Sequence, residues 1–259
     1  MKMTGKGSSI LIRSLIIAAV AVLWEASARF SGISPIILPS LLDIFREFYT
    51  GIHTGVLLAG ALRSLEMIIS GLGIGIVLAL LAAALAYNFR LIAHALDLAT
   101  AVAHPIPGIA LLPLVILWFG TGSQAVIWII VHSVLWPLVI NIRTGFNNTP
   151  EHLIMVGRNY ALSRRQFLIH ILLPGSLPFV VSGLKIAWSR AWRAVISAEM
   201  VFGAMGGRGG LGWYLFSKRV FMDSAGMFSG ILMLIIIGIL FERLIFTTIE
   251  QRTDTIWGR

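Results

Sequence analysis

The sequence predicts an all-α membrane protein with six transmembrane helices. Of its 259 residues, 58% are hydrophobic and only 12% are charged, and the mean hydropathy is +0.91. The hydrophobic residues come in runs close to or longer than the ~18 residues that a helix needs to cross a bilayer. A soluble protein of this length would alternate apolar and polar faces instead, so we exclude a water-soluble domain.

The first hydrophobic run, Ile10 to Ala28, follows the basic residues Lys2, Lys6 and Arg13. Such a run is typical of a first transmembrane helix and also of a secretory signal peptide, for which Ala26-Ser27-Ala28 has the form of a cleavage site. Because the rest of the chain is predicted to cross the membrane repeatedly, a retained helix is the simpler interpretation.

Two different patterns follow the first run. Residues Ser40 to Tyr49 have apolar side chains at helical spacing with charges opposite, which predicts a helix lying on one membrane surface. The run from about Ser64 to Tyr87 is rich in Gly and Ala, small residues that let neighbouring helices approach closely. We expect this second span to lie inside a bundle.

Prolines interrupt the third hydrophobic run, which we place at roughly residues 98 to 119, at Pro105, Pro107 and Pro113. In lipid, a broken helix is tolerated only where protein or water satisfies the freed carbonyl groups, so we expect this span to be buried or to line a cavity. The remaining three spans are predicted at Gln124 to Ile142, Leu177 to Val201 and Phe228 to Phe246.

The chain has 20 Lys and Arg residues against 11 Asp and Glu residues. In a soluble protein this excess would suggest a nucleic-acid partner, but here the cations lie between hydrophobic runs and form no long basic cluster. We therefore expect a lipid bilayer and no nucleic acid as the surroundings of this chain. More of the cations fall on the cytoplasmic side if both termini are cytoplasmic, which favours that orientation.

Residues Gly207 to Gly212 match the G-x-G-x-x-G pattern of dinucleotide sites. That pattern binds a pyrophosphate only between a strand and a helix, whereas here it follows a predicted transmembrane helix, so we interpret it as a flexible, tightly turning loop. Cysteine is absent and the six histidines are scattered without metal-ligand spacing. We therefore expect no metal site, no cofactor-binding residues and no catalytic residues.

A polar stretch between the fourth and fifth spans predicts a short amphipathic helix at about residues 150 to 164. Thr149 is a favourable N-cap, Pro150 suits the first turn, and Glu151 interacts well with the positive end of the helix dipole. One face of this helix would carry Leu153, Gly157, Tyr160 and Ala161. The two small residues on this face would let another protein approach closely.

The motif Ile171-Leu172-Leu173-Pro174, preceded by this helix, resembles the end of the E-A-A…G…I-x-L-P signature of permease subunits of bacterial ABC importers. The E-A-A positions hold Met155, Val156 and Gly157, and the glycine position holds Ala161. The chain from about residue 35 onward is similar to the nitrate, sulfonate and taurine branch, in which the glutamate is often lost. This similarity is carried by Pro105-Ile-Pro107, Leu112-Pro113-Leu114, Trp118-Phe119-Gly120-Thr-Gly122, Leu173-Pro174-Gly-Ser-Leu177-Pro178, Gly183-Leu-Lys185-Ile186, Arg190-Ala-Trp192 and Ala198-Glu199-Met200.

The resemblance implies a type I ABC importer permease fold whose cytoplasmic coupling helix docks on an ATPase. The docking residues would be Glu151, Leu153, Val156, Gly157, Tyr160, Ala161, Leu162 and Ser163. The implied protein is a non-catalytic subunit of a bacterial inner-membrane importer. Its partners would be a second copy of itself, two ABC ATPase subunits that use ATP and Mg, and a periplasmic solute-binding protein.

The resemblance also implies a small anionic cargo. Aliphatic sulfonates or taurine are favoured, while nitrate, bicarbonate and uncharged heterocyclic vitamin precursors stay open. We divide the chain into residues 1–63, with the first helix and the interfacial segment, residues 64–250, with a five-helix permease domain, and a cytoplasmic tail at 251–259.

Arg190 and Arg193 are three residues apart on the fifth span and share one face, where a cation costs at least ~2.5 kcal/mol unless it is paired or hydrated. They either pair with Glu199 or Glu66, or line a hydrated path for an anionic substrate. Pairing is favoured, because such importers receive substrate from an external protein. The candidate path or gate residues are Pro107, Pro113, Trp188, Arg190, Trp192, Arg193 and Glu199.

Two other classes of protein compete with this interpretation. An ATP-independent secondary transporter or channel usually shows inverted repeats or a relay of ionisable residues at mid-membrane, and we find no internal repeat. A membrane-bound enzyme would need a cluster of His, Asp or Glu at one membrane face, which the scattered histidines do not supply.

Overall fold

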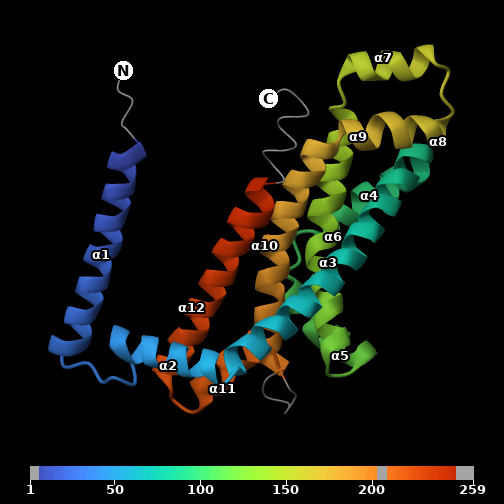
Figure 1. The fold of residues 1–259 in the computed structure, drawn as a ribbon. Helices are drawn as coiled ribbons and strands as arrows, with labels where there is room; N and C mark the ends of the chain where they lie inside the picture. Colours follow the sequence, from blue (N-terminus) through green and yellow to red (C-terminus); the bar gives the residue numbers. More distant parts are fainter. Residues whose placement is uncertain (1–5, 203–208, 249–259) are drawn as a thin grey trace.

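The computed structural model describes residues 6–202 and 209–248, and these form a bundle of helices with short helices at both ends (Figure 1). The helices in chain order are α1 (Lys6–Phe30), α2 (Leu41–His53), α3 (Val56–Asn88), α4 (Arg90–Ala103), η1 (Gly108–Leu111), α5 (Leu112–Phe119), α6 (Ser123–Asn147), α7 (Glu151–Asn159), α8 (Arg164–Phe167), η2 (Leu168–Leu172), α9 (Leu173–Gly175), α10 (Leu177–Phe202), α11 (Leu211–Val220), α12 (Ser224–Phe241) and η4 (Glu242–Phe246).

Four of these helices are long and apolar enough to cross a membrane, and six spans result if each of two bent helix pairs counts as one. The bent pairs are α4 with the segment from η1 to α5, and the segment from α8 to α9 with α10. The predicted six-span, all-α architecture is therefore confirmed. The second span begins at Val56, earlier than the predicted Ser64, and α3 runs without a break across residue 63.

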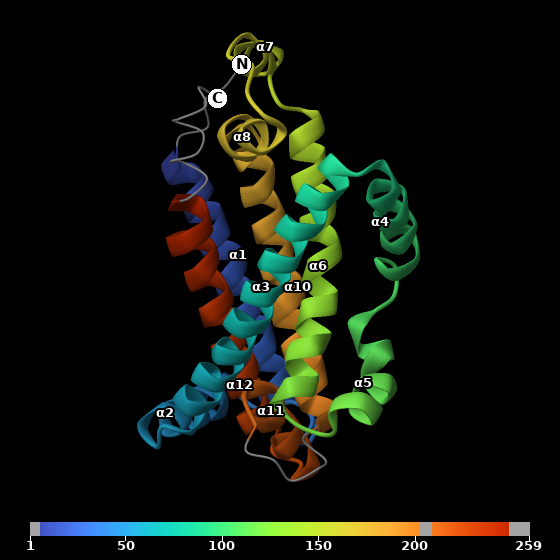
Figure 2. The same cartoon turned by 90° about the vertical axis from the view of Figure 1, so that its right-hand side faces the viewer.

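The core of the bundle lies where α6 packs between α3 and α10 (Figures 1 and 2). Glycines on α3 face α6 so closely that a Cβ atom on Gly71 would lie 2.6 Å from Ile130 Cγ2, and one on Gly75 would lie 2.4 Å from Val134 Cγ2. Only the absence of side chains on α3 permits this approach, as the glycine and alanine content predicted.

The third span is broken into two helices. After α4 the chain passes through Pro105 and Pro107 and resumes as η1 and α5, with a bend of 92° between the two parts. Proline cannot donate a backbone hydrogen bond and disfavours a helical residue before it, which explains the break. The predicted distortion is thus correct in place, but the predicted start at residue 98 is wrong: α4 already begins at Arg90, beside the end of α3 (Figure 2).

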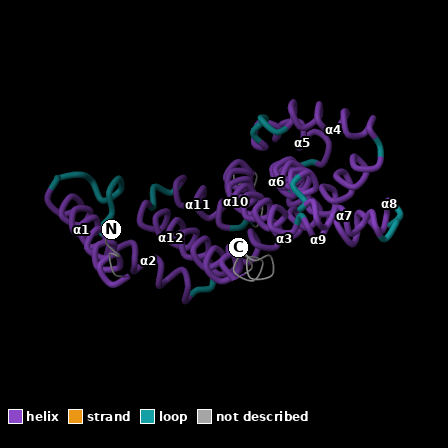
Figure 3. Tube along the Cα trace, turned by 90° about the horizontal axis from the view of Figure 1, so that it is seen from above, coloured by secondary structure: helices purple, strands orange, loops and turns teal. Residues whose placement is uncertain are grey.

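The two ends of the bundle differ. The helices α7, α8 and α9 lie at one end, together with the beginning of α1 and the end of α12, whereas α2 and α11 lie at the other (Figure 1). Seen along the bundle, α1 stands at one edge and α4 and α5 at the opposite edge (Figure 3). The amphipathic helix predicted at residues 40 to 49 is present as α2, capped by the Ser40 side chain.

Candidate functional site

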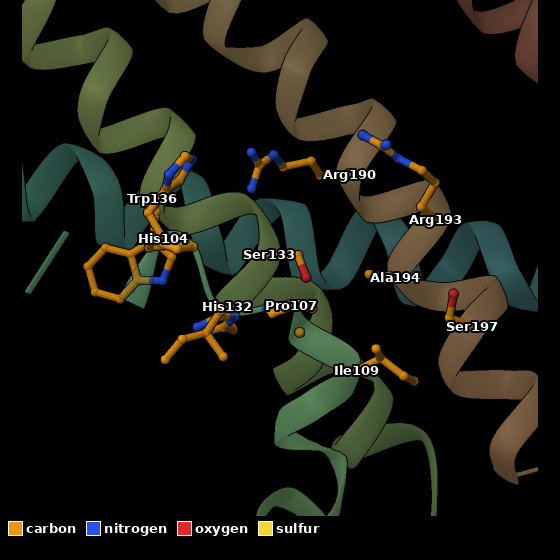
Figure 4. A pocket seen from close by; sticks show the side chains of 13 residues that line it. His104, Pro107, Ile109, His132, Ser133, Trp136, Arg190, Arg193, Ala194 and Ser197 are labelled. Carbon is orange, nitrogen blue, oxygen red and sulfur yellow. The ribbon is translucent and has the colours of Figure 1, made fainter. Parts of the chain in front are cut away.

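A cavity of about 490 Å³ lies at the break in the third span, between the loop after α4 and the helices α6 and α10 (Figure 4). Its polar lining comes from His104 of the loop, from His132, Ser133 and Trp136 of α6, and from Arg190, Arg193 and Ser197 of α10. The break therefore opens onto a polar cavity, as a proline-interrupted span in lipid requires.

The arginines that line the cavity lie near the middle of α10. Arg190 lies thirteen residues after the start of α10 at Leu177 and twelve residues before its end at Phe202. At 1.5 Å per residue, about 18 to 20 Å of helix separates this arginine from each end of the span. The two arginines are thus far from both ends of α10.

The predicted pairing of these arginines with Glu199 or Glu66 is absent from the described part of the chain. Arg193 Nε donates to the carbonyl oxygen of Ser189, one turn back on the same helix, at 3.2 Å. None of the residues that line the cavity is acidic. In the described residues both arginines therefore line the cavity and neither is paired with Glu199 or Glu66.

The seven candidate path or gate residues lie in different places. Pro107, Arg190 and Arg193 line the cavity, whereas Pro113 is exposed on α5. On α10 the helical repeat sets Trp188, Trp192 and Glu199, at spacings of four and seven, on the face opposite the arginines. There Trp188 stacks on Phe241, with ring centroids 4.2 Å apart, and on Trp192 at 6.2 Å.

Sequence reasoning missed the polar groups that face the arginines from other elements: His104, His132, Ser133 and Trp136. The only local signals are that His104 immediately precedes the predicted proline break and that the other three cluster within five residues of α6. Which side of α6 faces α10 depends on the tertiary packing.

Glu199 is the centre of a buried hydrogen-bond network that joins α3, α10 and the start of α11. Its carboxylate accepts from Ser64 Oγ of α3, at 2.9 and 3.0 Å, and from the backbone N–H of Gly212 at 2.7 Å. Ser64 Oγ in turn accepts from the N–H of Leu211 at 2.9 Å. A buried polar group is stable only when it is hydrogen-bonded, and these contacts meet that requirement.

The glycines at the start of α11 are needed for this network. A Cβ atom on Gly210 would lie 2.1 Å from Ser64 Oγ and 2.2 Å from Glu199 Oε1, and one on Gly212 would lie 2.5 Å from the carbonyl oxygen of Ile196. The first part of the glycine-rich pattern lies outside the described residues. In the described part, Gly209 and Gly210 lie in a loop and Leu211 and Gly212 begin α11, and the backbone is held against a buried carboxylate.

The helix predicted at about residues 150 to 164 is a helix, a turn and a second helix. The first helix, α7, begins after Pro150, and the side chain of Thr149 donates to the carbonyl oxygen of Gly145 instead of capping α7. After α7 ends at Asn159 the chain reverses, and Ser163 starts α8 through a reciprocal capping interaction with Gln166. Ser163 is thus a second helix start inside the predicted range, so residues 150 to 164 do not form one continuous helix.

The faces of α7 also differ from the expectation. Gly157 is buried against this chain's own Phe167, whose Cε2 atom would lie 2.6 Å from an added Cβ. The large hydrophobic side chains that α7 and its C-terminal turn expose are Met155, Val156 and Tyr160, the last of them 78% exposed. The predicted helix face is therefore divided between internal packing through Gly157 and an exposed apolar surface.

Ala161 lies in the turn after α7 with a φ angle of 47°. This is the left-handed region, which glycine adopts without the steric cost that a Cβ atom brings. The signature that the chain resembles has glycine at this position, and the turn geometry supplies the reason.

At the opposite end of the bundle, Lys218 of α11 joins two other elements. Its Nζ lies 2.5 Å from Asp223 Oδ2 and 3.7 Å from Glu47 Oε2 of α2. Burial alone would lower the pKa of Lys218, but the hydrogen bond to Asp223 and the neighbouring charges outweigh it, so this pKa lies above its usual value. Burial would raise the pKa of Asp223, and the hydrogen bonds from Lys218 and the Gly226 N–H outweigh it and lower that pKa. The turn between α11 and α12 is thus tied to α2 through charged groups.

Comparison with known proteins identifies the family. Residues 71–254 match the family described as the binding-protein-dependent transport system inner membrane component. A relative from Methanocaldococcus jannaschii, provisionally named an ABC transporter permease protein, is 30% identical over 77% of this chain and 76% of its own length. A relative from Escherichia coli, provisionally named an aliphatic sulfonates transport permease, is 28% identical over 85% of this chain and 82% of its own length.

Further relatives agree with the branch that the motifs indicated: a taurine transport permease of Escherichia coli matches at 26% identity and a nitrate import permease of Synechocystis at 25%. Among solved structures, the MetNI methionine ABC transporter in inward-facing conformations shares the fold, with a TM-score of 0.57 at 20% identity, over 77% of this chain and 94% of that chain. The chain therefore belongs to the family of binding-protein-dependent transport system inner membrane components, the permease subunits of ABC importers.

Proposed function

We propose that this chain is the membrane subunit of an ATP-driven importer for a small anion, delivered by a periplasmic binding protein. An aliphatic sulfonate or taurine is the first choice of cargo, and nitrate or bicarbonate the next. The names of the relatives support this class of cargo. The observation that carries the ATP-driven part is α7, which lies at one end of the bundle and exposes apolar side chains there (Figure 1).

The exposed surface of α7 and the turn after it is the proposed docking site for an ABC ATPase. Met155 adds to the predicted contact residues, whereas buried Gly157 supports α7 from inside. The predicted set retained for contact is Glu151, Leu153, Val156, Tyr160, Ala161, Leu162 and Ser163. The ATPase would bind ATP and Mg, and this chain would contribute no catalytic residue.

The remaining assembly follows from the same proposal. Two copies of the chain would pair, each with one ATPase, and the α7 end of the bundle would face the cytoplasm, the side on which we also expect both termini. Arg158, Arg164 and Arg165 cluster near α7, as the preference of basic residues for the cytoplasmic side favours. The division at residues 1–63, 64–250 and 251–259 stays part of this proposal.

The packing of α7 suggests how ATP would move the cavity. Gly157 of α7 lies against Phe167 of α8 and Ile171 of η2, and this segment continues through α9 into α10. A shift of α7 on an ATPase would therefore press directly on the helix that carries Arg190 and Arg193. Rigid helices that exchange between two packed arrangements are the usual means of such coupling.

The anion class is tested by competition. Membrane vesicles that contain the permease, its ATPase and its binding protein are given radiolabelled ethanesulfonate and ATP. We expect unlabelled propanesulfonate to suppress uptake and the size-matched neutral and cationic compounds, propanol and propylamine, to leave it unchanged. Equal suppression by propanol would contradict the anion assignment.

A further inference from the structure

We propose that the cavity at the break in the third span is an anion-binding site of the permease itself, which holds one small oxyanion headgroup during passage. The class includes sulfonates, nitrate and carboxylates. This inference rests on the proposed anionic cargo. It means that the permease, and not the binding protein alone, selects the anion.

The charge of the cavity is the first argument. Arg190 and Arg193 both line it from one face of α10, and no acidic residue lines it. Figure 4 shows the side chain of Arg190 extending from α10 toward Trp136 and His104 on the opposite wall. A guanidinium group offers several N–H donors in one plane, a geometry that matches two oxygens of a sulfonate, nitrate or carboxylate.

Two buried polar atoms on the opposite wall are the second argument, because they have no hydrogen-bond partner in the described residues. Trp136 Nε1 and His132 Nδ1 are buried and form no hydrogen bond within the described residues. An indole N–H can only donate, and a buried donor without an acceptor is destabilising. An anion between α6 and α10 would neutralise the arginines of α10, and a turn of the Trp136 ring would bring its N–H into the cavity to donate to the same anion.

The third argument is that the site is built on fixed elements. A Cβ atom on Gly108 would lie 2.5 Å from Ser133 Oγ, so the loop after the prolines packs directly on α6. Ser133 Oγ is itself held by a 2.8 Å hydrogen bond to the carbonyl oxygen of Ile129. The volume of about 490 Å³ lies within the ~300–1,000 Å³ of typical ligand pockets.

The experiment measures binding without the binding protein. The full permease, purified with its ATPase, is titrated with radiolabelled ethanesulfonate in equilibrium dialysis. We expect saturable binding that weakens at least tenfold in Arg190→Gln and in Arg193→Gln. The affinity of Arg193→Lys, which keeps the charge and loses the planar guanidinium group, should lie between those of the unchanged protein and Arg193→Gln.

The matched control is Arg219→Gln, which removes an exposed arginine of α11 outside the cavity and should bind like the unchanged protein. Co-purification with the ATPase shows that each variant is folded. Equal affinity in the unchanged protein, Arg190→Gln and Arg193→Gln, or no saturable binding in any folded form, would overturn the site. If ATP-driven, anion-selective uptake persists in that case, the site alone is wrong; if uptake is not anion-selective, the proposed function fails as well.

Discussion

Replacing both Val156 and Tyr160 with aspartate is expected to abolish ATP-driven uptake while the permease stays folded. Both side chains are exposed on α7 and the turn after it, 44% and 78% respectively, so their loss removes little internal packing. If they are central contacts with the ATPase, each loss costs about 2 kcal/mol, and the two together weaken association by about three orders of magnitude. The added carboxylates would also enter an apolar contact.

The measurement is the amount of ATPase that co-purifies with the tagged permease in mild detergent, together with uptake in vesicles. The control is Tyr49→Asp, which makes the same change at an exposed tyrosine of α2, at the other end of the bundle. Stoichiometric ATPase in the double variant would contradict the docking surface. Replacing Gly157 would not be a clean test, because this residue packs against Phe167 inside the same chain.

Replacing Glu199 with alanine is expected to destabilise the permease strongly. The change leaves the Ser64 hydroxyl and the Gly212 N–H buried without their acceptor. Each unsatisfied buried donor costs about 1 to 3 kcal/mol, and the lost contacts leave a cavity as well. A loss of at least about 3 kcal/mol corresponds to a fall of about 10 °C in the unfolding midpoint.

Thermal unfolding of the purified protein, followed by the fraction that stays monodisperse, measures this effect. Glu199→Gln keeps the shape and one acceptor oxygen, so its midpoint should lie between those of the alanine variant and the unchanged protein. The control is Glu66→Ala, which removes an exposed carboxylate from α3. Equal midpoints for Glu199→Ala and Glu66→Ala would show that the network does not stabilise the fold.

Much of the fold could be predicted from local pattern because bilayer thickness sets the length of a span. The hydrophobic runs located the spans, Pro105 and Pro107 located the break, and the small residues of α3 indicated the close contact with α6. The spacing of Arg190 and Arg193 placed them on one face. These features depend on residues close in the sequence, where the repeat of the helix relates position directly to direction.

The partners of those residues could not be predicted in the same way. Glu199 binds Ser64, which is 135 residues away, and the periodicity of α10 does not identify what lies opposite its face. For the same reason the sequence assigned Gly157 to a partner protein, whereas the chain reverses after Asn159 and covers it with Phe167. The left-handed backbone at Ala161 allows this reversal. The sequence does not predict it, because alanine is a good helix former.

The central claim is that this chain moves a solute only when an ATPase partner drives it. The direct test is to reconstitute the purified permease in liposomes, with and without its co-purified ATPase, and to measure uptake of radiolabelled ethanesulfonate supplied with the binding protein. The account predicts uptake only with both ATPase and ATP. Uptake by the permease alone, in the absence of ATP, would contradict the account and identify a secondary transporter or channel.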